Sequence, residues 1–308
     1  MLDILISSVT QGLLWSIMSI GIYVMFRLLD IADLSAEGTF TTGAAITAII
    51  ITMELESSLQ AYLPVLATVG ALLGGALAGL VAGWIHTKMN IPPLLTGILM
   101  QTGLYSVNLR IMGGKSNIAM LRNDTIFTPL EQLTGWGKNL NTIVVCFVIA
   151  VFVIGIMYWF LETEIGLSFR ATGDNLRMSE ANGINTNRMK TLGYMIANGI
   201  IALSGSLVVQ YSGYSDMQMG IGTIATGLAA IVIAEVIIPN QPIHRRLMTI
   251  ILGSIIYRLI IDIILNQPWI NIQASDLRLL TAIILGIVLF LPELRKYSRR
   301  RSAVKGGH

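Results

Sequence analysis

The chain has 308 residues, of which 54% are hydrophobic and only 12% are charged, and its mean hydropathy is +0.72. Because soluble domains carry about 25% charged residues, this composition excludes a soluble globular protein and predicts a polytopic membrane protein. The small excess of 20 basic over 17 acidic residues gives no argument for nucleic-acid binding, and one cysteine with three scattered histidines excludes a disulfide framework and offers no metal-ligand spacing.

Apolar runs mark the predicted membrane segments. They fall at about 4–26, 38–53, 62–84, 94–112, 141–161, 191–210, 221–238, 247–265 and 279–291. Most approach the roughly 20 residues that a spanning helix needs, whereas 38–53 and 279–291 have the length of half-spans. The first run has no basic region before it and no cleavage site after it, so we expect a retained span. The fold class is therefore an all-α polytopic membrane protein with about nine membrane segments (8–10) in a single domain, residues 1–308.

The distribution of Lys and Arg predicts the orientation of these segments. Loops rich in basic residues remain in the cytoplasm, which assigns the tail 292–308, with Arg299, Arg300 and Arg301, to that side. Alternation through nine segments then puts the loop 163–190 in the cytoplasm as well. The loop 113–140 and the N-terminus fall outside the cell.

Two stretches of the chain repeat one another. EGTFTTGAAITA (37–48) matches IGTIATGLAAIV (221–232) at an offset of 184 residues, and LLTGILM (94–100) matches LLTAIIL (279–285) at an offset of 185. Four segments in about 4–112 would thus recur in about 191–291, with the segment 141–161 as a central link that inverts the second copy. Inverted repeats are typical of transporters, which bind substrate at the repeat interface. The alternative is that small residues recur by chance.

Polar residues gather at the start of each repeated stretch. Irregular polar backbone at membrane depth is tolerated where it lines a cavity or is buried in protein. We therefore expect a translocation path lined by Asp33, Ser35, Glu37, Thr39 and Thr42 from the first copy and by Asp216 and Thr223 from the second. The alternative is that these groups only satisfy the backbone of broken helices. Arg258 and Asp262 lie four residues apart and are expected to neutralise each other.

The polar loop 163–190 has a pattern of its own. Its charges are interrupted by apolar Phe169 and Met178 and by glycine breakers, which predicts one or two short surface helices with turns. We expect a short helix over Leu167–Glu180 and a turn over Ile184–Arg188. Phe169 and Met178 would form an apolar knob for a partner protein. The residues expected to make this contact are Gly166, Phe169, Arg170, Asp174, Arg177, Met178, Gly183, Ile184 and Arg188. A solvated linker is the alternative.

The loop sequence GLSFRATGDNLRMSEANGINTNRMK resembles the cytoplasmic loop of permease subunits of branched-chain amino-acid-type ABC importers. The stretch DLSAEGTF (33–40) looks like a subgroup associated with aromatic amino acids, and AEVI (234–237) departs from the Gly-rich turn usual in branched-chain members. The resemblance implies a prokaryotic cell-membrane subunit that translocates amino acids, aromatic rather than branched-chain.

The resemblance also implies a division of labour between subunits. A partner ATPase would hold ATP and Mg and grip the loop 163–190, so this chain would be no enzyme and would bind no cofactor. An external binding protein would deliver substrate, and a second permease copy or a paralogue would complete a dimer. An ion-coupled secondary transporter with inverted repeats is the alternative, and co-purification of an ATPase would discriminate between the two. The sequence leaves the substrate and the dimer type open.

Overall fold

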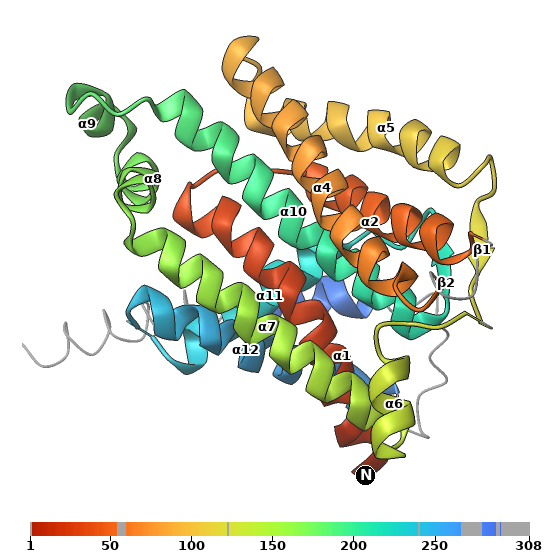
Figure 1. The fold of residues 1–308 in the computed structure, drawn as a ribbon. Helices are drawn as coiled ribbons and strands as arrows, with labels where there is room; N and C mark the ends of the chain where they lie inside the picture. Colours follow the sequence, from red (N-terminus) through yellow and green to blue (C-terminus); the bar gives the residue numbers. More distant parts are fainter. Residues whose placement is uncertain are drawn as a thin grey trace, which may run out of the picture.

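The fold is almost entirely helical (Figure 1). In the computed structural model, the described residues are 2–53, 60–121, 123–239, 241–265, 279–287 and 290. The long helices are α1 (Leu2–Tyr23), which continues into a π-helical turn (Val24–Leu28), α2 (Ser35–Ile51), α4 (Leu63–Lys88), α5 (Pro93–Ile111), α7 (Lys138–Glu162), α10 (Thr186–Ser212), α11 (Thr223–Ile237) and α12 (Ile243–Leu265). Residues 279–287 are also helical. The shorter helices are α6 (Thr128–Thr134), α8 (Glu164–Asp174) and α9 (Leu176–Ala181).

The predicted class of all-α polytopic membrane protein is confirmed. Five described helices are long and apolar enough to cross a membrane: Asp3–Leu28, Leu63–Lys88, Lys138–Glu162, Thr186–Ser212 and Arg245–Leu265. Helices α2 and α11 have only 17 and 15 residues, which is below the roughly 20 that a full span needs. The predicted tail 292–308 and the end of the run 279–291 lie outside the described residues.

Two strands and two small helices mark the opposite ends of the bundle. Strand β1 (Asn117–Ala119) pairs antiparallel with β2 (Tyr214–Asp216), so that Ile118 faces Ser215. We call this end, which also carries α6, the β1–β2 end. The other end carries α8 and α9 and is called the α8–α9 end (Figure 1).

Helices α1 and α10 run antiparallel through the middle of the bundle. The Ser204 hydroxyl of α10 donates to the Leu14 carbonyl of α1 at 2.9 Å. Nearer the α8–α9 end, Gly21 lies so close to α10 that an added Cβ would be 2.7 Å from a side-chain carbon of Ile201. Close contact of this kind needs a residue without a side chain.

Helix α2 begins halfway along α10 and runs parallel to it. Ser35, the first residue of α2, contacts Asn198 in the middle of α10, and Thr47 donates to Ser206 further along. Helix α2 therefore runs from the interior toward the β1–β2 end.

Helix α11 begins beside the start of α2 and runs the other way. The backbone N–H of Gly222 donates to the Glu37 carboxylate at 2.9 Å, and Glu235 in the last turn of α11 forms a salt bridge with Arg27 at the α8–α9 end. The two short helices thus start close together inside the bundle and diverge to opposite ends.

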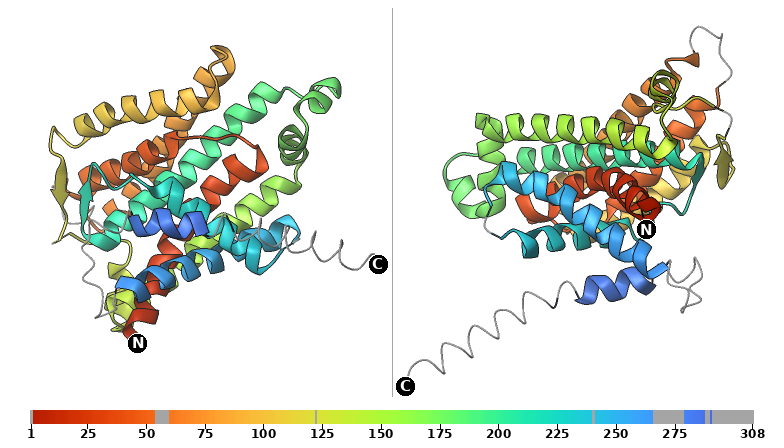
Figure 2. Two further views of the ribbon diagram at one scale, coloured as in Figure 1. Left: turned by 180° about the vertical axis from the view of Figure 1, so that it is seen from behind. Right: turned by 90° about the horizontal axis from the view of Figure 1, so that it is seen from below.

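Helices α4 and α12 flank this centre on different sides (Figure 2). Helix α4 packs antiparallel against α10, and Gly75, Gly79 and Gly83 all face the α10 backbone, as expected of helix-packing glycines. Helix α12 packs antiparallel against α1, where Ser8 donates to the Asp262 carboxylate at 2.7 Å. These two helices run in opposite directions, as do α1 and α10.

The outward faces of α4, α5 and α7 are apolar and exposed. Leu77, Tyr105, Phe152 and Trp159 are each at least half exposed. Such a large apolar surface is typical of contact with lipid.

Candidate functional site

The loop between α7 and α10 consists of two short helices with a side-chain cap at each start. The Thr163 hydroxyl accepts the Gly166 N–H before α8, and Asn175 accepts the Met178 N–H before α9. Asn185 caps α10 in the same way by accepting from Arg188. Thr and Asn are favoured at such positions because their oxygens satisfy N–H groups that the helix leaves unpaired. The loop therefore holds two short helices, as one of the two expected arrangements had it. A continuous helix over Leu167–Glu180 is wrong, because Asn175 has an extended backbone and ends α8.

Phe169 is not part of an exposed knob, contrary to the sequence-based expectation. Its side chain is fully buried and packs edge-on against Phe160 of α7, with ring centroids 5.7 Å apart. Gly193 of α10 provides the space for this ring. Phe169 therefore fixes α8 to α7 and α10 within the chain itself.

The glycines of the loop serve the same docking. An added Cβ at Gly166 would collide with the Phe160 carbonyl, and one at Gly173 would collide with the Leu28 carbonyl. Together with Phe169 they form one face of α8, because residues three, four and seven apart lie on the same side of a helix. Gly183 has φ +81°, which few other residues adopt, and makes the turn between α9 and α10.

The exposed part of the loop is centred on α9. Met178 is 64% exposed and Leu176 is 37% exposed. The charged residues around them, Asp174, Arg177 and Arg188, are exposed, whereas Arg170 and Ile184 are half-buried. A surface with one large flexible apolar side chain and flanking charges is suited to protein–protein contact. We call Leu176, Arg177, Met178 and Arg188 the α9 surface.

Most of the expected path residues at the start of α2 are buried and hydrogen-bonded. The Asp33 carboxylate accepts from the Ser35 N–H and hydroxyl, both at 2.8 Å, and from the Asn198 amide at 3.0 Å. Thr39 and Thr42 donate to carbonyls one turn earlier in α2. Asp33, Ser35, Thr39 and Thr42 thus lie in the protein core, where Asp33 satisfies the start of α2 and attaches it to α10.

Glu37 instead lines a cavity of about 480 Å³ between α2, α5 and the segment before α11. Its carboxylate accepts from the Gln101 amide and from the Gly222 N–H, both at 2.9 Å. Asn108 lines the same cavity, is fully buried, and leaves its Oδ1 atom without a hydrogen-bond partner among the described residues. We call this space the Glu37 cavity.

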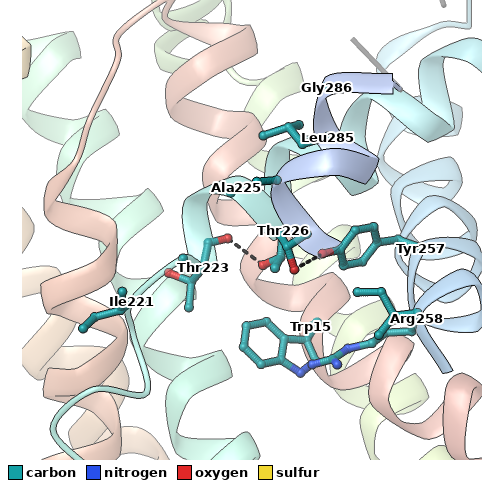
Figure 3. Close-up of a pocket in the computed structure, with 13 residues that line it drawn as sticks. Trp15, Ile221, Thr223, Ala225, Thr226, Tyr257, Arg258, Leu285 and Gly286 are labelled. Atoms are coloured by element: carbon teal, nitrogen blue, oxygen red, sulfur yellow. Dashed lines mark hydrogen bonds between the residues drawn. The ribbon is translucent and has the colours of Figure 1, made fainter. Parts of the chain in front are cut away.

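A second cavity of about 530 Å³ lies between α1, α11, α12 and residues 281–286 (Figure 3). Thr223 and Arg258 line it, and Ile221 is a wall of both cavities. The Arg258 guanidinium lies over the Trp15 ring, 4.8 Å from its centroid. We call this space the Arg258 cavity. The hydrogen bond between Glu37 and Gly222 lies at the boundary of the two cavities.

Asp216 lies apart from both cavities. It belongs to β2 at the β1–β2 end, where it accepts from the Asn117 amide at 3.3 Å and from the Gln218 N–H at 2.7 Å. The structure therefore brings Glu37 and Thr223 to the cavities but leaves Asp216 in the pair of strands β1 and β2.

Sequence reasoning missed the amide groups that complete this site. Gln101 and Asn108 lie seven residues apart in α5, which puts them on one helix face. Asn198 is a buried amide in the apolar middle of α10. The sequence did contain a signal for these residues. Polar side chains within apolar helices, spaced so that they share one helix face, would have pointed to them.

The chain resembles known proteins along nearly its whole length. Residues 4–291 match the family model of the branched-chain amino acid transport system permease component. The chain is 39% identical over 287 residues to the tyrosine transport system permease protein of Clostridioides difficile (strain R20291), which covers 93% of this chain and 90% of that protein. It is 32% identical over 294 residues to the uncharacterized protein RP368 of Rickettsia prowazekii (strain Madrid E), covering 94% and 96% of the two chains. No solved structure matches the chain.

The burial of Phe169 and the exposure of Met178 predict opposite effects of truncation. Phe169→Ala should destabilise the purified protein by about 3–5 kcal/mol, because it leaves a cavity between α7, α8 and α10. Met178→Ala should change stability by less than about 0.5 kcal/mol, because its side chain has no core contacts to lose. The apparent unfolding temperature in detergent measures both. Equal unfolding temperatures for the two variants would contradict this arrangement.

Proposed function

The chain belongs to the family of branched-chain amino acid transport system permease components, and we propose that it is the membrane-spanning subunit of an ATP-driven importer of amino acids. The observation that carries this proposal is the family match, which extends over residues 4–291 and therefore over every described membrane helix. The apolar outward faces of α4, α5 and α7 agree with a subunit that lies in lipid.

The proposed substrate is an aromatic amino acid. The relative that is 39% identical to this chain over 287 residues is named as a permease of tyrosine transport. That alignment covers 93% of this chain, so it extends over most of the described helices. Cavities of a few hundred cubic ångströms are of the size that holds small molecules.

The proposed partners follow from the role of a permease component. A separate ATPase subunit would bind ATP with Mg and hydrolyse it, so this chain would have no enzymatic step of its own. An external protein would deliver the amino acid. A second copy of the chain, or a paralogue, would complete the membrane unit.

The proposed path passes between the starts of α2 and α11. The Glu37 cavity and the Arg258 cavity meet there, with Ile221 as their common wall. Glu37 and Thr223 would face the substrate, and Asp33, Ser35, Thr39 and Thr42 would support α2 from behind. Asp216 would act only at the β1–β2 end.

The proposed architecture remains two inverted repeats around α7, with nine membrane segments. Three pairs of helices that correspond in the repeat support it, namely α1 with α10, α2 with α11 and α4 with α12, because the members of each pair run in opposite directions. The packing is paired in the same way. Helix α4 packs on α10 as α12 packs on α1. Gly43 of α2 contacts α10, and Gly227 of α11, 184 residues later, contacts α1.

The proposed orientation has the N-terminus outside and the α8–α9 end in the cytoplasm. Basic residues support it, since loops rich in Lys and Arg remain in the cytoplasm. Those of the α8–α9 end are Arg27, Lys88, Arg170, Arg177, Arg188, Lys190, Arg245 and Arg246. The described basic residues near the β1–β2 end are Arg110, Lys115 and Lys138.

The ATPase subunit would contact the α9 surface. Met178 would enter an apolar pocket of the ATPase, and Arg177 and Arg188 would meet acidic groups at its rim. Buried anchors in an interface are commonly worth about 2 kcal/mol or more, and rim charges less. Helix α8, held by Phe169, Gly166 and Gly173, would transmit the movement of α9 to α7 and to the turn Val24–Leu28.

Uptake measurements test the proposed function. The tagged chain should co-purify an ATPase, and proteoliposomes supplied with the external binding protein should accumulate labelled L-tyrosine when ATP is present on the cytoplasmic side. Ionophores should leave this uptake unchanged, because ATP supplies the free energy. Uptake that follows a sodium or proton gradient without ATP would instead indicate an ion-coupled transporter.

A cysteine at Met178 tests orientation and ATPase contact together. In a Cys146→Ser background, Met178→Cys should react with a membrane-impermeant maleimide in inside-out vesicles stripped of the ATPase, and rebinding the ATPase should protect it. The matched control is Leu133→Cys in α6, where the native side chain is 84% exposed.

The control cysteine should react in intact cells, whether or not the ATPase is bound. Labelling of the Met178→Cys protein from outside intact cells would contradict the orientation. Equal labelling with and without the ATPase would contradict the contact.

A further inference from the structure

The Arg258 cavity is lined by a charged group, Arg258, to which the function proposed above gives no role. Arg258 lies in the second half of α12, a helix long and apolar enough to cross the membrane. Charged side chains within membrane helices are costly and mark functional sites when they face a cavity. We propose that the Arg258 cavity binds the carboxylate group of the transported amino acid, an inference that rests on the proposed function.

The guanidinium of Arg258 lies over the Trp15 ring, at 4.8 Å from the centroid (Figure 3). Trp15 in turn stacks on Phe40, with ring centroids 5.4 Å apart. Contact with an aromatic face leaves the N–H groups of a guanidinium able to donate. Arginine binds carboxylates through two parallel N–H groups of such an edge.

The start of α11 also lines the cavity, but it is already occupied by acceptors from the chain. Gly222, Thr223, Ala225 and Thr226, the N-cap and first turn of α11, face the cavity opposite α12. The Gly222 N–H donates to the Glu37 carboxylate at 2.9 Å and the Thr223 N–H to the Gly220 carbonyl at 3.2 Å. The Arg258 guanidinium is therefore the group of this cavity that would meet a carboxylate.

Asp262, the sequence-based partner of Arg258, is engaged by another helix. Its carboxylate accepts from the Ser8 hydroxyl of α1 at 2.7 Å. The two residues are one turn apart on α12, whereas Arg258 also reaches α1 through Trp15. The described residues show no ion pair within 4.0 Å between Arg258 and Asp262, although the two charges lie close enough to interact.

The rest of the cavity suits the remainder of an amino acid. Ile221, Ala225, Ile261, Ala282 and Leu285 give it apolar walls. Tyr257 and Thr226 add hydroxyl groups, and the Tyr257 hydroxyl is already hydrogen-bonded to Thr281 at 3.1 Å. The cavity of about 530 Å³ lies within the range of roughly 300–1,000 Å³ found for small-molecule sites.

Arginine substitutions in the complete transport complex test this assignment. The complex of permease, ATPase and binding protein is reconstituted in proteoliposomes, and labelled L-tyrosine taken up per ATP hydrolysed is measured. This ratio is independent of how much complex is folded. Arg258→Gln should lower it about tenfold or more, since hydrogen bonds to charged groups are worth about 1.5–3 kcal/mol. Arg258→Lys should retain more uptake than Arg258→Gln, because it keeps the charge.

Arg110→Gln is the matched control, because Arg110 is an exposed arginine at the end of α5 and lines neither cavity. It should leave the ratio unchanged. If Arg258→Gln keeps the wild-type ratio, or lowers only the unfolding temperature, Arg258 has a structural role and the inference is overturned while the proposed function stands. A wild-type complex that takes up no amino acid overturns the proposed function and, with it, this inference.

Discussion

The fold depends on how the protein satisfies two helix starts inside an apolar bundle. A backbone N–H without a partner in hydrocarbon costs several kcal/mol, so a helix that begins there needs an acceptor from elsewhere in the chain. Asp33 supplies one for α2 by accepting from the Ser35 N–H, and Glu37 supplies one for α11 by accepting from the Gly222 N–H. Because Glu37 itself belongs to the first turn of α2, a single carboxylate joins the starts of two helices that diverge to opposite ends. The acidic residues that looked like a substrate path in the sequence are first of all acceptors for the backbone.

The same requirement explains why cavities occur at this place. Two helices that begin inside the bundle leave the space beyond their starts to side chains and loops, and both cavities lie beside these starts. Glycines keep the junction narrow. Gly220 lies against the Glu37 carbonyl and Gly43 against Ala202, where any side chain would collide with backbone. Polar atoms such as Asn108 Oδ1 and the Arg258 guanidinium then border spaces that helix packing does not fill, which is where a transporter can bind its substrate.

Much of the fold could be predicted from the sequence, because hydrophobic runs and breakers act locally. The apolar runs within the described residues coincide with helices, and the short length of α2 was evident from 38–53. The side on which a residue points was harder to predict. Phe169 among charges looked exposed, yet Gly166 and Gly173, three before it and four after it, indicated a face that packs closely. Asp33 and Glu37 lie about one helical turn apart in the sequence. Their roles differ only because of tertiary contacts: Asp33 is a core residue bound to Asn198, whereas Glu37 is bound to Gln101 and lines a cavity. Arg258 and Asp262 have ideal spacing for a pair, but α1 supplies competing contacts that spacing within α12 cannot reveal.

The most direct test of this account is the unfolding temperature of the purified Glu37→Leu protein. Leucine has a similar size but no acceptor, so the Gly222 N–H and the Gln101 amide both lose their partner, and we predict a loss of about 1–3 kcal/mol of stability. Glu37→Gln should keep most of the stability, because its amide oxygen can accept from Gly222 while its NH2 group donates to the oxygen of a turned Gln101 side chain. A Glu37→Leu protein that unfolds at the wild-type temperature would contradict the claim that this carboxylate holds the two helix starts together.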